Sequence, residues 1–227
     1  MLRSNKLRNA MRKARYKLLS AVHGKESERA RLSKDSIQDY WRNPPGRNNR
    51  PDAYVDYAAQ SNAVVRLVQD LGVAPGPLLE IGPNVGRNLQ SFFEAGWTDL
   101  TAIEINPEAV ARMAELFPDM ARGANILNMP VEDGIVTLPE RHYELVFSKA
   151  VLLHIHPDSE WVFERMARAT KGTLVVIENE DQQSYKLFPR KYRPIFEGHG
   201  MVQIDERILP EVGDTYIARS FRPVAGG

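Results

Sequence analysis

The sequence predicts an α/β fold whose mostly parallel sheet ends in an antiparallel hairpin and is preceded by a helical extension. From Pro77 onward, short apolar runs alternate with helical patterns at the pace of βαβ units. The run at residues 173–177 is continuous, apolar and β-branched, which is typical of a strand buried on both faces. Residues 201–208 and 215–221 form two further extended runs, separated by a proline and a glycine, and these predict the closing hairpin.

Composition and hydropathy restrict the class of protein. The 227 residues are 43% hydrophobic and 26% charged, which is typical of a soluble globular protein. No apolar run approaches the ~18 residues of a membrane-spanning helix, and the N-terminus lacks the features of a secretory signal, so we expect a cytoplasmic protein. The absence of cysteine excludes disulfides, thiolate catalysis and cysteine-ligated metal centres.

Residues 1–50 are predicted to form a basic helical arm and a Pro/Asn-rich loop, followed by a main domain over residues 51–227. Residues 1–25 contain eight Lys or Arg and no acid, whereas the remainder contains 22 bases and 29 acids. Apolar positions in the arm recur at helical steps: Leu7, Met11, Ala14, Leu18 and Val22. The arm could dock on its own domain or on a second subunit of a homodimer, or contact an anionic membrane or substrate. Nucleic-acid binding is disfavoured because no aromatic stacking pattern accompanies the charge.

The remaining elements follow from apolar periodicity and from turn residues. In chain order we expect a helix at 54–71, a strand at 78–81, a helix at 88–95, a strand at 100–105, a helix at 107–117, a short strand near 122–124, a strand at 143–148 and a helix at 158–170. In open sheets of this kind the carboxyl ends of the strands face the ligand crevice.

A glycine turn follows the first of these strands. Residues 80–88 read Glu-Ile-Gly-Pro-Asn-Val-Gly-Arg-Asn, so that a strand enters a turn and a helix N-terminus points its free N–H groups at the opening. Gly82 and Gly86 are four positions apart, which differs from the G-x-G-x-x-G spacing of dinucleotide-binding folds. Glu80, two residues before the first glycine, would repel a pyrophosphate but suits a cationic or amine-bearing ligand.

This segment resembles motif I of the class I S-adenosylmethionine-dependent methyltransferases, whose pattern is acid-x-Gly-x-Gly-x-Gly. Glu80, Gly82 and Gly86 match, while Asn84 stands where the middle glycine usually is. With Asn88 included, the segment is similar to the small methylases of sugar-biosynthetic clusters, of the pseudaminic-acid-associated type. The resemblance implies a Rossmann-like, seven-stranded fold and S-adenosylmethionine as the cofactor, with these residues around its methionine moiety.

Two later segments extend the resemblance, which covers about residues 54–221. Glu104, at the tip of the second strand, resembles the acid that binds both ribose hydroxyls in this family, and Ile105 resembles the apolar residue beside adenine. Asn125 and Ile126 stand where the family places a polar side chain and a backbone N–H against the adenine. An amide carbonyl can accept a hydrogen bond from the exocyclic amine as a carboxylate does.

The reaction end of the site is predicted after the fourth strand, which is expected to end at Ser148. Ser148 and the following Lys149 resemble residues beside the methyl donor, and the signature of base N-methylases (Asn or Asp, Pro, Pro, aromatic) is absent. Histidine is the default general base near neutral pH, so His154 is our first candidate and His156 the second. Each could instead be a hydrogen-bonded structural histidine.

Acids gather at the end of the next strand. Glu178, Glu180 and Asp181 could orient a sugar hydroxyl, act as the base or, with His156 or Asp158, hold Mg²⁺, or they could form a solvated loop. We include Glu178 among the catalytic candidates and leave the metal open. The basic, aromatic segment at residues 186–192, with His199, resembles the lid of the sugar-linked methylases and could bind an acceptor.

The resemblance therefore implies a methyltransferase that O-methylates a sugar hydroxyl of a saccharide or nucleotide-linked sugar, as in polysaccharide biosynthesis. Alternatives are an N- or C-methyltransferase of another small metabolite and a non-catalytic module that binds an adenosyl ligand. A dinucleotide oxidoreductase is disfavoured by the glycine spacing.

Overall fold

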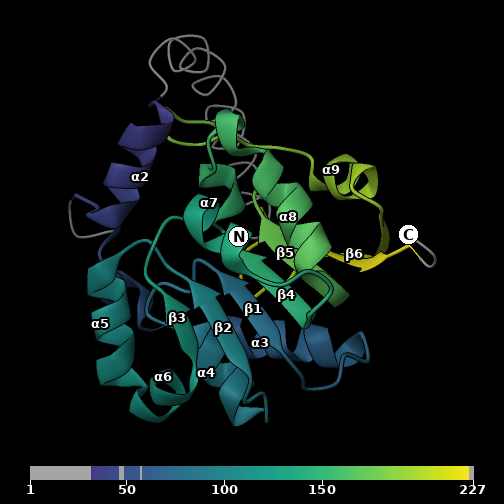
Figure 1. Ribbon diagram of the computed structural model, residues 1–227, viewed down its shortest axis with the longest axis horizontal. Coiled ribbons are helices and arrows are strands. Elements are labelled where there is room, and N and C mark those ends of the chain that lie inside the picture. Colours follow the sequence, from purple (N-terminus) through teal and green to yellow (C-terminus); the bar gives the residue numbers. More distant parts are fainter. Residues whose placement is uncertain (1–31, 46–48, 57, 225–227) are drawn as a thin grey trace, which may run out of the picture.

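A seven-stranded sheet, in the order β3-β2-β1-β4-β5-β7-β6, forms the centre of the molecule (Figure 1). The computed structural model describes residues 32–45, 49–56 and 58–224, so the predicted arm at residues 1–25 lies outside the described residues. Strands β1 to β5 are parallel, and β7 is antiparallel to both β5 and β6. The predicted fold class is confirmed. The strands are β1 (Leu78–Ile81), β2 (Leu100–Ile103), β3 (Asn125–Leu127), β4 (Tyr143–Lys149), β5 (Thr170–Glu178), β6 (Met201–Arg207) and β7 (Ile217–Pro223).

Helices cover both faces of this sheet. The described helices are α2 (Lys34–Arg42), α3 (Ala58–Asp70), α4 (Arg87–Glu94), α5 (Pro107–Leu116), α6 (Pro118–Gly123), α7 (Val131–Gly134), α8 (Trp161–Ala169) and α9 (Tyr192–Gly198), with short 3₁₀ turns η2 (Pro51–Tyr54), η3 (Ile135–Thr137), η4 (Leu152–His154) and η5 (Pro157–Ser159). Figure 1 shows α8 in front of the sheet and α3 and α4 behind it. Each face has its own core, one with Phe163 and Phe196, the other with Leu67 and Phe92.

The register of the central strands aligns their carboxyl ends. Ile81, the last residue of β1, pairs with Ile103 of β2 and with Ser148 of β4. All residues of β1 and β2 are buried because helices pack on both faces, as the continuous apolar runs predict. Helix α5 begins next to the end of β2, where the side chain of Asn106 accepts hydrogen bonds from two N–H groups of the first turn. Two helix N-termini, those of α4 and α5, therefore begin at the same edge of the sheet.

The short third strand predicted near residues 122–124 is present as β3, but its predicted bounds are wrong. Residues 122 and 123 end helix α6, and β3 begins only at Asn125. Pro118 starts this short helix and Met120 anchors it in the core. The predicted helix at 158–170 also begins later, at Trp161, because residues 157–159 form the 3₁₀ turn η5.

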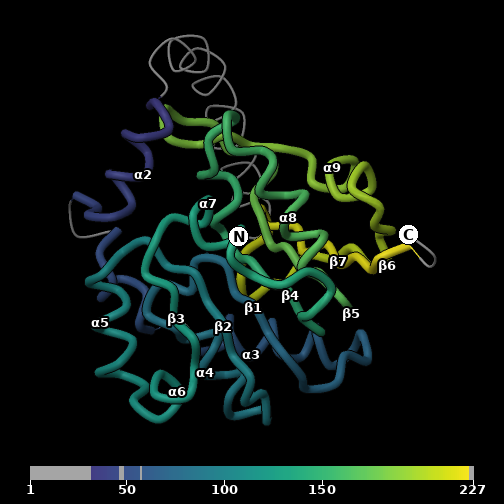
Figure 2. Tube along the Cα trace, in the orientation of Figure 1, coloured from purple at the N-terminus to yellow at the C-terminus, as the bar shows by residue number. Residues whose placement is uncertain are grey.

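Helix α2 lies against a distant part of the chain. Figure 2 shows its purple trace meeting the yellow-green trace of residues 182–188. The N–H of Leu32 donates to the carbonyl of Tyr185, 3.1 Å away, and Lys186 reaches the hydroxyl of Tyr40. None of the helices in the described ranges is long and apolar enough to span a membrane.

Candidate active site

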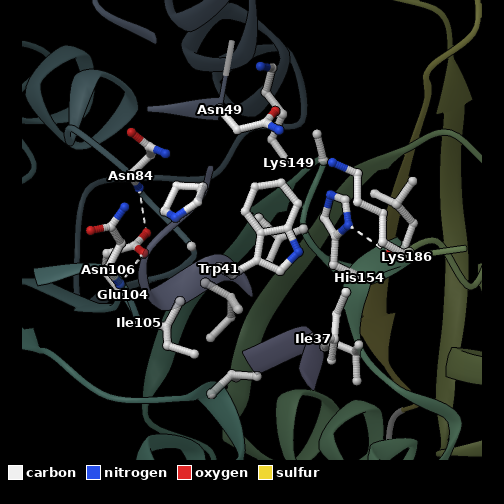
Figure 3. Close-up of a pocket in the computed structure, with 18 of the residues that line it drawn as sticks. Ile37, Trp41, Asn49, Asn84, Glu104, Ile105, Asn106, Lys149, His154 and Lys186 are labelled. Carbon is white, nitrogen blue, oxygen red and sulfur yellow. Dashed lines mark hydrogen bonds between the residues drawn. The ribbon is translucent and has the colours of Figure 1, made fainter. Parts of the chain in front are cut away.

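A cavity of about 380 Å³ lies at the carboxyl edge of the parallel strands (Figure 3). This volume falls within the range of small-molecule sites, roughly 300–1,000 Å³. Its floor includes the last residues of three strands, Ile81, Ile103 and Lys149, and α2 and residues 182–187 line the opposite side. Of the predicted site residues, six line this cavity: Gly82, Asn84, Glu104, Ile105, Lys149 and His154.

Glu104 is held in a fixed orientation at the cavity wall. Its Oε2 accepts the N–H of Asn84 and its Oε1 accepts the N–H of Asn106, each at 2.8 Å. Burial raises the pKa of Glu104, and these two N–H groups oppose the rise. Each carboxylate oxygen still has a lone pair. The side chain can therefore accept two further hydrogen bonds from a vicinal diol such as a ribose.

The departure from the glycine pattern at Asn84 has a conformational reason. Asn84 has φ 52°, in the left-handed region, which asparagine adopts more readily than most residues. This conformation directs its N–H to Glu104. Asn84 therefore takes the backbone role of a glycine and at the same time orients the acid.

The two glycines of the turn serve different contacts. Gly82 lines the cavity with φ 69°, and a Cβ there would lie 2.5 Å from Cγ2 of Val151, in the loop after β4. Gly86 has φ 77°, and a Cβ there would lie 2.5 Å from Cγ of Met113 in α5. Gly86 does not line the cavity, so its contact serves the packing of α4 against α5.

Glu80 lies beneath the turn. Its Oε1 accepts from Asn88, 2.8 Å away, and the amide oxygen of Asn88 in turn accepts from Ser61 at 2.8 Å. The other oxygen of Glu80 is buried without a hydrogen-bond partner among the described residues. Burial raises the pKa of Glu80 to about 7 although Asn88 acts against it. Neither Glu80 nor Asn88 lines the cavity.

Lys149 is one of two cations, with Arg87, that act on this buried acid. Burial, and to a smaller extent Arg87, lowers the pKa of Lys149 to about 8, and the carboxylates of Glu80 and Glu178 act in the opposite direction. Lys149 lines the cavity, and its ammonium forms no ion pair with the part of the chain that the structure describes. The preceding Ser148 is fully buried and does not line the cavity.

Glu178 holds the loop that follows β4. Its Oε1 accepts the N–H groups of Val151 and Leu152, both at 2.9 Å, and the loop contains Ala150 in a left-handed conformation with φ 58°. Burial raises the pKa of Glu178 to about 7. Glu178 does not line the cavity, so its position supports a role in orienting the loop rather than contact with a substrate.

The other acids of this cluster are engaged in ion pairs. Glu180 is buried and pairs with Arg219 of β7 at 2.7 and 3.0 Å, and Asp181 pairs with the exposed Lys191 at 2.7 Å. Across residues 32–45, 49–56 and 58–224, no group of three or more His, Asp or Glu side chains could hold a metal ion.

The two histidines differ in their surroundings. His154 lines the cavity, and its ring centroid lies 4.3 Å from that of Trp41. Its Nδ1 is 3.4 Å from the carbonyl of Lys186, which can only accept, so Nδ1 carries the proton and Nε2 is the acceptor. Burial lowers the pKa of His154 to about 3, so the ring is neutral at neutral pH. His156 instead caps the turn η5 by accepting the N–H of Asp158, and it lies outside the cavity lining.

Asn125 and Ile126 do not reach the cavity. Asn125 is the exposed first residue of β3, and Ile126 packs against the core on one face of the sheet. Because α6 occupies residues 118–123, strand β3 starts later than predicted. Asn128 is therefore the residue that follows the carboxyl end of β3. Its amide donates to the carbonyl of Glu104 at 2.7 Å. Asn128 belongs to the same polar run as Asn125, and only the strand boundary could have distinguished them.

The sequence reasoning missed the part of the cavity wall that helix α2 forms. Ile37 and Trp41 of α2 and Asn49 line the cavity opposite the strand ends. Figure 3 shows Trp41 between Glu104 and Ile105 on one side and His154 and Lys186 on the other. The polar, charged sequence of α2 gives no signal of this contact; only Lys186, in the predicted lid, was assigned to the acceptor side.

The comparisons with known proteins agree with this architecture. Residues 79–176 match the family model described as a methyltransferase domain. A search of curated protein sequences gives no match. Among solved structures, 1,6-didemethyltoxoflavin-N1-methyltransferase of Burkholderia thailandensis is 20% identical, with a TM-score of 0.61 over 76% of this chain and 81% of that chain. An S-adenosylmethionine-dependent methyltransferase of Leishmania major is 15% identical, with a TM-score of 0.66 over 84% and 82%. Magnesium protoporphyrin IX methyltransferase of Synechocystis PCC 6803 is 15% identical, with a TM-score of 0.63 over 84% and 100%.

The domain match and the architecture agree on the kind of fold. Residues 79–176, somewhat less than half of the chain, match the methyltransferase-domain model, and the seven-stranded sheet has the fold of the solved methyltransferases. These structural neighbours act on chemically unrelated acceptors, so likeness of fold does not select an acceptor for this chain.

Proposed function

We propose that the protein transfers a methyl group from S-adenosylmethionine to a hydroxyl of a sugar, in a saccharide or a nucleotide-linked sugar. The observation that carries the proposal is that one cavity combines Glu104, oriented for a diol, Lys149, an ammonium without an ion-pair partner in the described chain, and His154, an imidazole with an acceptor nitrogen. The choice of a sugar rests on the resemblance of residues 80–88 to sugar-cluster methylases.

The residues of the cavity fit the proposed cofactor. Glu104 would accept the ribose hydroxyls, Ile105 would pack beside the adenine, and Lys149 would pair with the methionine carboxylate. Gly82 lines the cavity, and its lack of a side chain lets the glycine turn pack directly on Val151 in the loop after β4. When bound, the cofactor supplies an electrophilic methyl group on a sulfonium. A solved neighbour crystallised with S-adenosylhomocysteine supports the assignment.

His154 has the geometry of the group that accepts the proton of the hydroxyl. The carbonyl of Lys186 fixes Nδ1 as the donor, so Nε2 can receive the proton as the oxygen attacks. Trp41 covers the ring and keeps bulk water from it. Glu178 would contribute indirectly, because it accepts hydrogen bonds from Val151 and Leu152 in the loop that leads to His154.

One observation favours the second candidate, N-methylation of a small metabolite. A pKa of about 3 is far from neutral pH, and the efficiency of a general base declines with that distance. A neutral amine attacks without first losing a proton, so it depends less on a strong base. An amine acceptor would therefore tolerate the lowered pKa of His154.

A transfer assay with mass analysis of the product tests the proposal. The protein is incubated with labelled S-adenosylmethionine and, in separate reactions, with saccharides, nucleotide sugars and small amines. We expect a methyl ether on a sugar; a methylated nitrogen would support the second candidate. Calorimetry with S-adenosylhomocysteine and with NAD provides the control. Binding of S-adenosylhomocysteine without any transfer would indicate a binding module, and binding of NAD alone would overturn the cofactor assignment.

A further inference from the structure

The wall opposite the strand ends contains a cation, Lys186, that no acid of the described ranges neutralises. Lys186 donates to the hydroxyl of Tyr40 at 2.6 Å, and its ammonium lies 4.4 Å from the centroid of the Tyr40 ring and 5.3 Å from that of Trp41. No carboxylate in the described ranges lies within ion-pair distance of Lys186. Aromatic rings stabilise such a cation, but they leave its charge available to a ligand.

The hydrogen bonds around this cation leave donors without acceptors. The Tyr40 hydroxyl accepts from both Lys186 and Asn49, each at 2.6 Å, and its own hydrogen has no acceptor among the described residues. The indole N–H of Trp41 is buried and is likewise without an acceptor in the described part of the chain. A wall rich in donors and lacking acids is complementary to an oxyanion.

The second cation of the cavity has a different position. Lys149 ends β4 on the floor, where Glu80 and Glu178 contribute to its electrostatic environment. Lys186 belongs to the cover, where its backbone carbonyl contacts His154 and its side chain contacts α2. The two ammonium groups therefore suit two different anionic groups, one on each side of the cavity.

We propose that the acceptor carries an oxyanion, a carboxylate or a phosphate, which binds to the ammonium of Lys186, and that the hydroxyl of Tyr40 holds this ammonium in place. This inference rests on the proposed function and specifies its substrate class as an acidic or phosphorylated acceptor. Lys186 then orients the acceptor beneath Trp41, next to His154, and Lys149 remains free for the carboxylate of the cofactor.

Anion binding to the complex with S-adenosylhomocysteine tests this inference. Inorganic phosphate and acetate are titrated while the ¹⁵N-indole signal of Trp41, assigned with Trp41→Phe, is followed. We expect a saturable shift that Lys186→Met weakens by roughly 10- to 100-fold and Lys186→Arg largely retains. Lys171→Met is the matched control, because Lys171 is an exposed lysine paired with Glu144 outside this cavity. Absence of a saturable shift, or equal anion affinity of Lys186→Met and the wild-type protein, would overturn the inference.

A second titration distinguishes the two sources of the oxyanion. Glucose 6-phosphate, glucuronate and glucose are compared under the same conditions. Tighter binding of the first indicates a phosphate, and tighter binding of the second indicates a carboxylate. If glucose binds as tightly as both, the inference is wrong. Calorimetry with S-adenosylhomocysteine distinguishes failure of this inference from failure of the proposed function. If the wild-type protein binds S-adenosylhomocysteine but shows no anion preference, only this inference is wrong. If the wild-type protein does not bind S-adenosylhomocysteine, the proposed function is wrong.

Discussion

Replacement of Gly82 by alanine tests whether the glycine turn must pack directly on the loop after β4. Gly82 has φ 69°, and an added Cβ would lie 2.5 Å from Cγ2 and 2.9 Å from Cγ1 of Val151. The left-handed conformation costs a non-glycine residue about 1–2 kcal/mol, and overpacking costs typically about 1–3 kcal/mol. We therefore expect Gly82→Ala to lower the free energy of unfolding by about 2–5 kcal/mol.

Gly72 offers a matched control for the conformational part of this cost. Its φ is 71°, and nothing lies within 4 Å of an added Cβ. Gly72→Ala should therefore cost only about 1–2 kcal/mol. Urea denaturation of both variants gives the difference, which isolates the contact with Val151. If Gly82→Ala is no more destabilising than Gly72→Ala, the reasoning about close packing is refuted.

A double variant identifies the contact itself. Val151→Ala removes the two methyl groups that an alanine at position 82 would meet and leaves only the Cβ of residue 151, at 3.2 Å, so most of the clash should be relieved in Gly82→Ala/Val151→Ala. We expect a favourable coupling of about 1–3 kcal/mol between the two substitutions. Additive effects would mean that the strain lies in the backbone conformation alone.

The other predictions concern the acids and histidines of the site. Glu104→Ala should weaken binding of S-adenosylhomocysteine, since it removes charge-assisted hydrogen bonds of about 1.5–3 kcal/mol each; unchanged affinity in calorimetry would place the ribose elsewhere. His154→Ala should lower turnover by roughly 10²–10⁴-fold with little change in cofactor affinity, while His156→Ala, which loses a turn cap, should retain turnover; the reverse order would assign the base to His156. Because burial lowers the pKa of His154 to about 3, the rate should not change with pH near ~6.5, where an ordinary histidine titrates. If the wild-type rate does fall below pH ~6.5 and His154→Ala shows no such fall, the lowered pKa of His154 is contradicted. The pKa of Glu178 is raised to about 7, so the contribution of Glu178 to the free energy of unfolding falls as pH rises from the unfolded pKa through about 7. Glu178→Gln, which stays neutral, should therefore be more stabilising at about pH 8 than at about pH 5 in urea denaturation. An equal effect at both pH values would argue against titration of this group.

The strands that the sequence predicted correctly are those with a strong apolar signal. Strand β1 has the bounds expected, because four buried residues lead directly into a glycine turn, and the core of β5 is a β-branched run. Strand β3 has partly exposed residues and follows a six-residue helix that starts at Pro118. Because this apolar pattern is weak, the start of β3 was predicted too early. Asn125, which was predicted to lie at the site, is instead the first residue of the strand.

The site shows the same limit for side chains whose neighbours come from distant segments. Glu104 and Lys149 could be predicted because they sit at strand ends, where the topology alone brings them to the crevice. The orientation of the Glu178 side chain could not be predicted, because it depends on the loop after β4, whose N–H groups donate to its carboxylate. The contact of Trp41 with His154 joins residues with no local relation, and only the folded chain reveals it.

The contact between Tyr40 and Lys186 also has a consequence for the order in which the chain assembles. The two residues are 146 positions apart. At the usual rate of synthesis, ~5–20 residues per second, α2 leaves the ribosome about 7–30 s before its partner segment. During that interval α2 has no partner at residues 182–187, and the mostly charged and polar sequence around Ile37 and Trp41 limits the apolar surface it exposes. The wall formed by α2 and residues 182–187 therefore cannot be completed until strands β1 to β5 have all been synthesised.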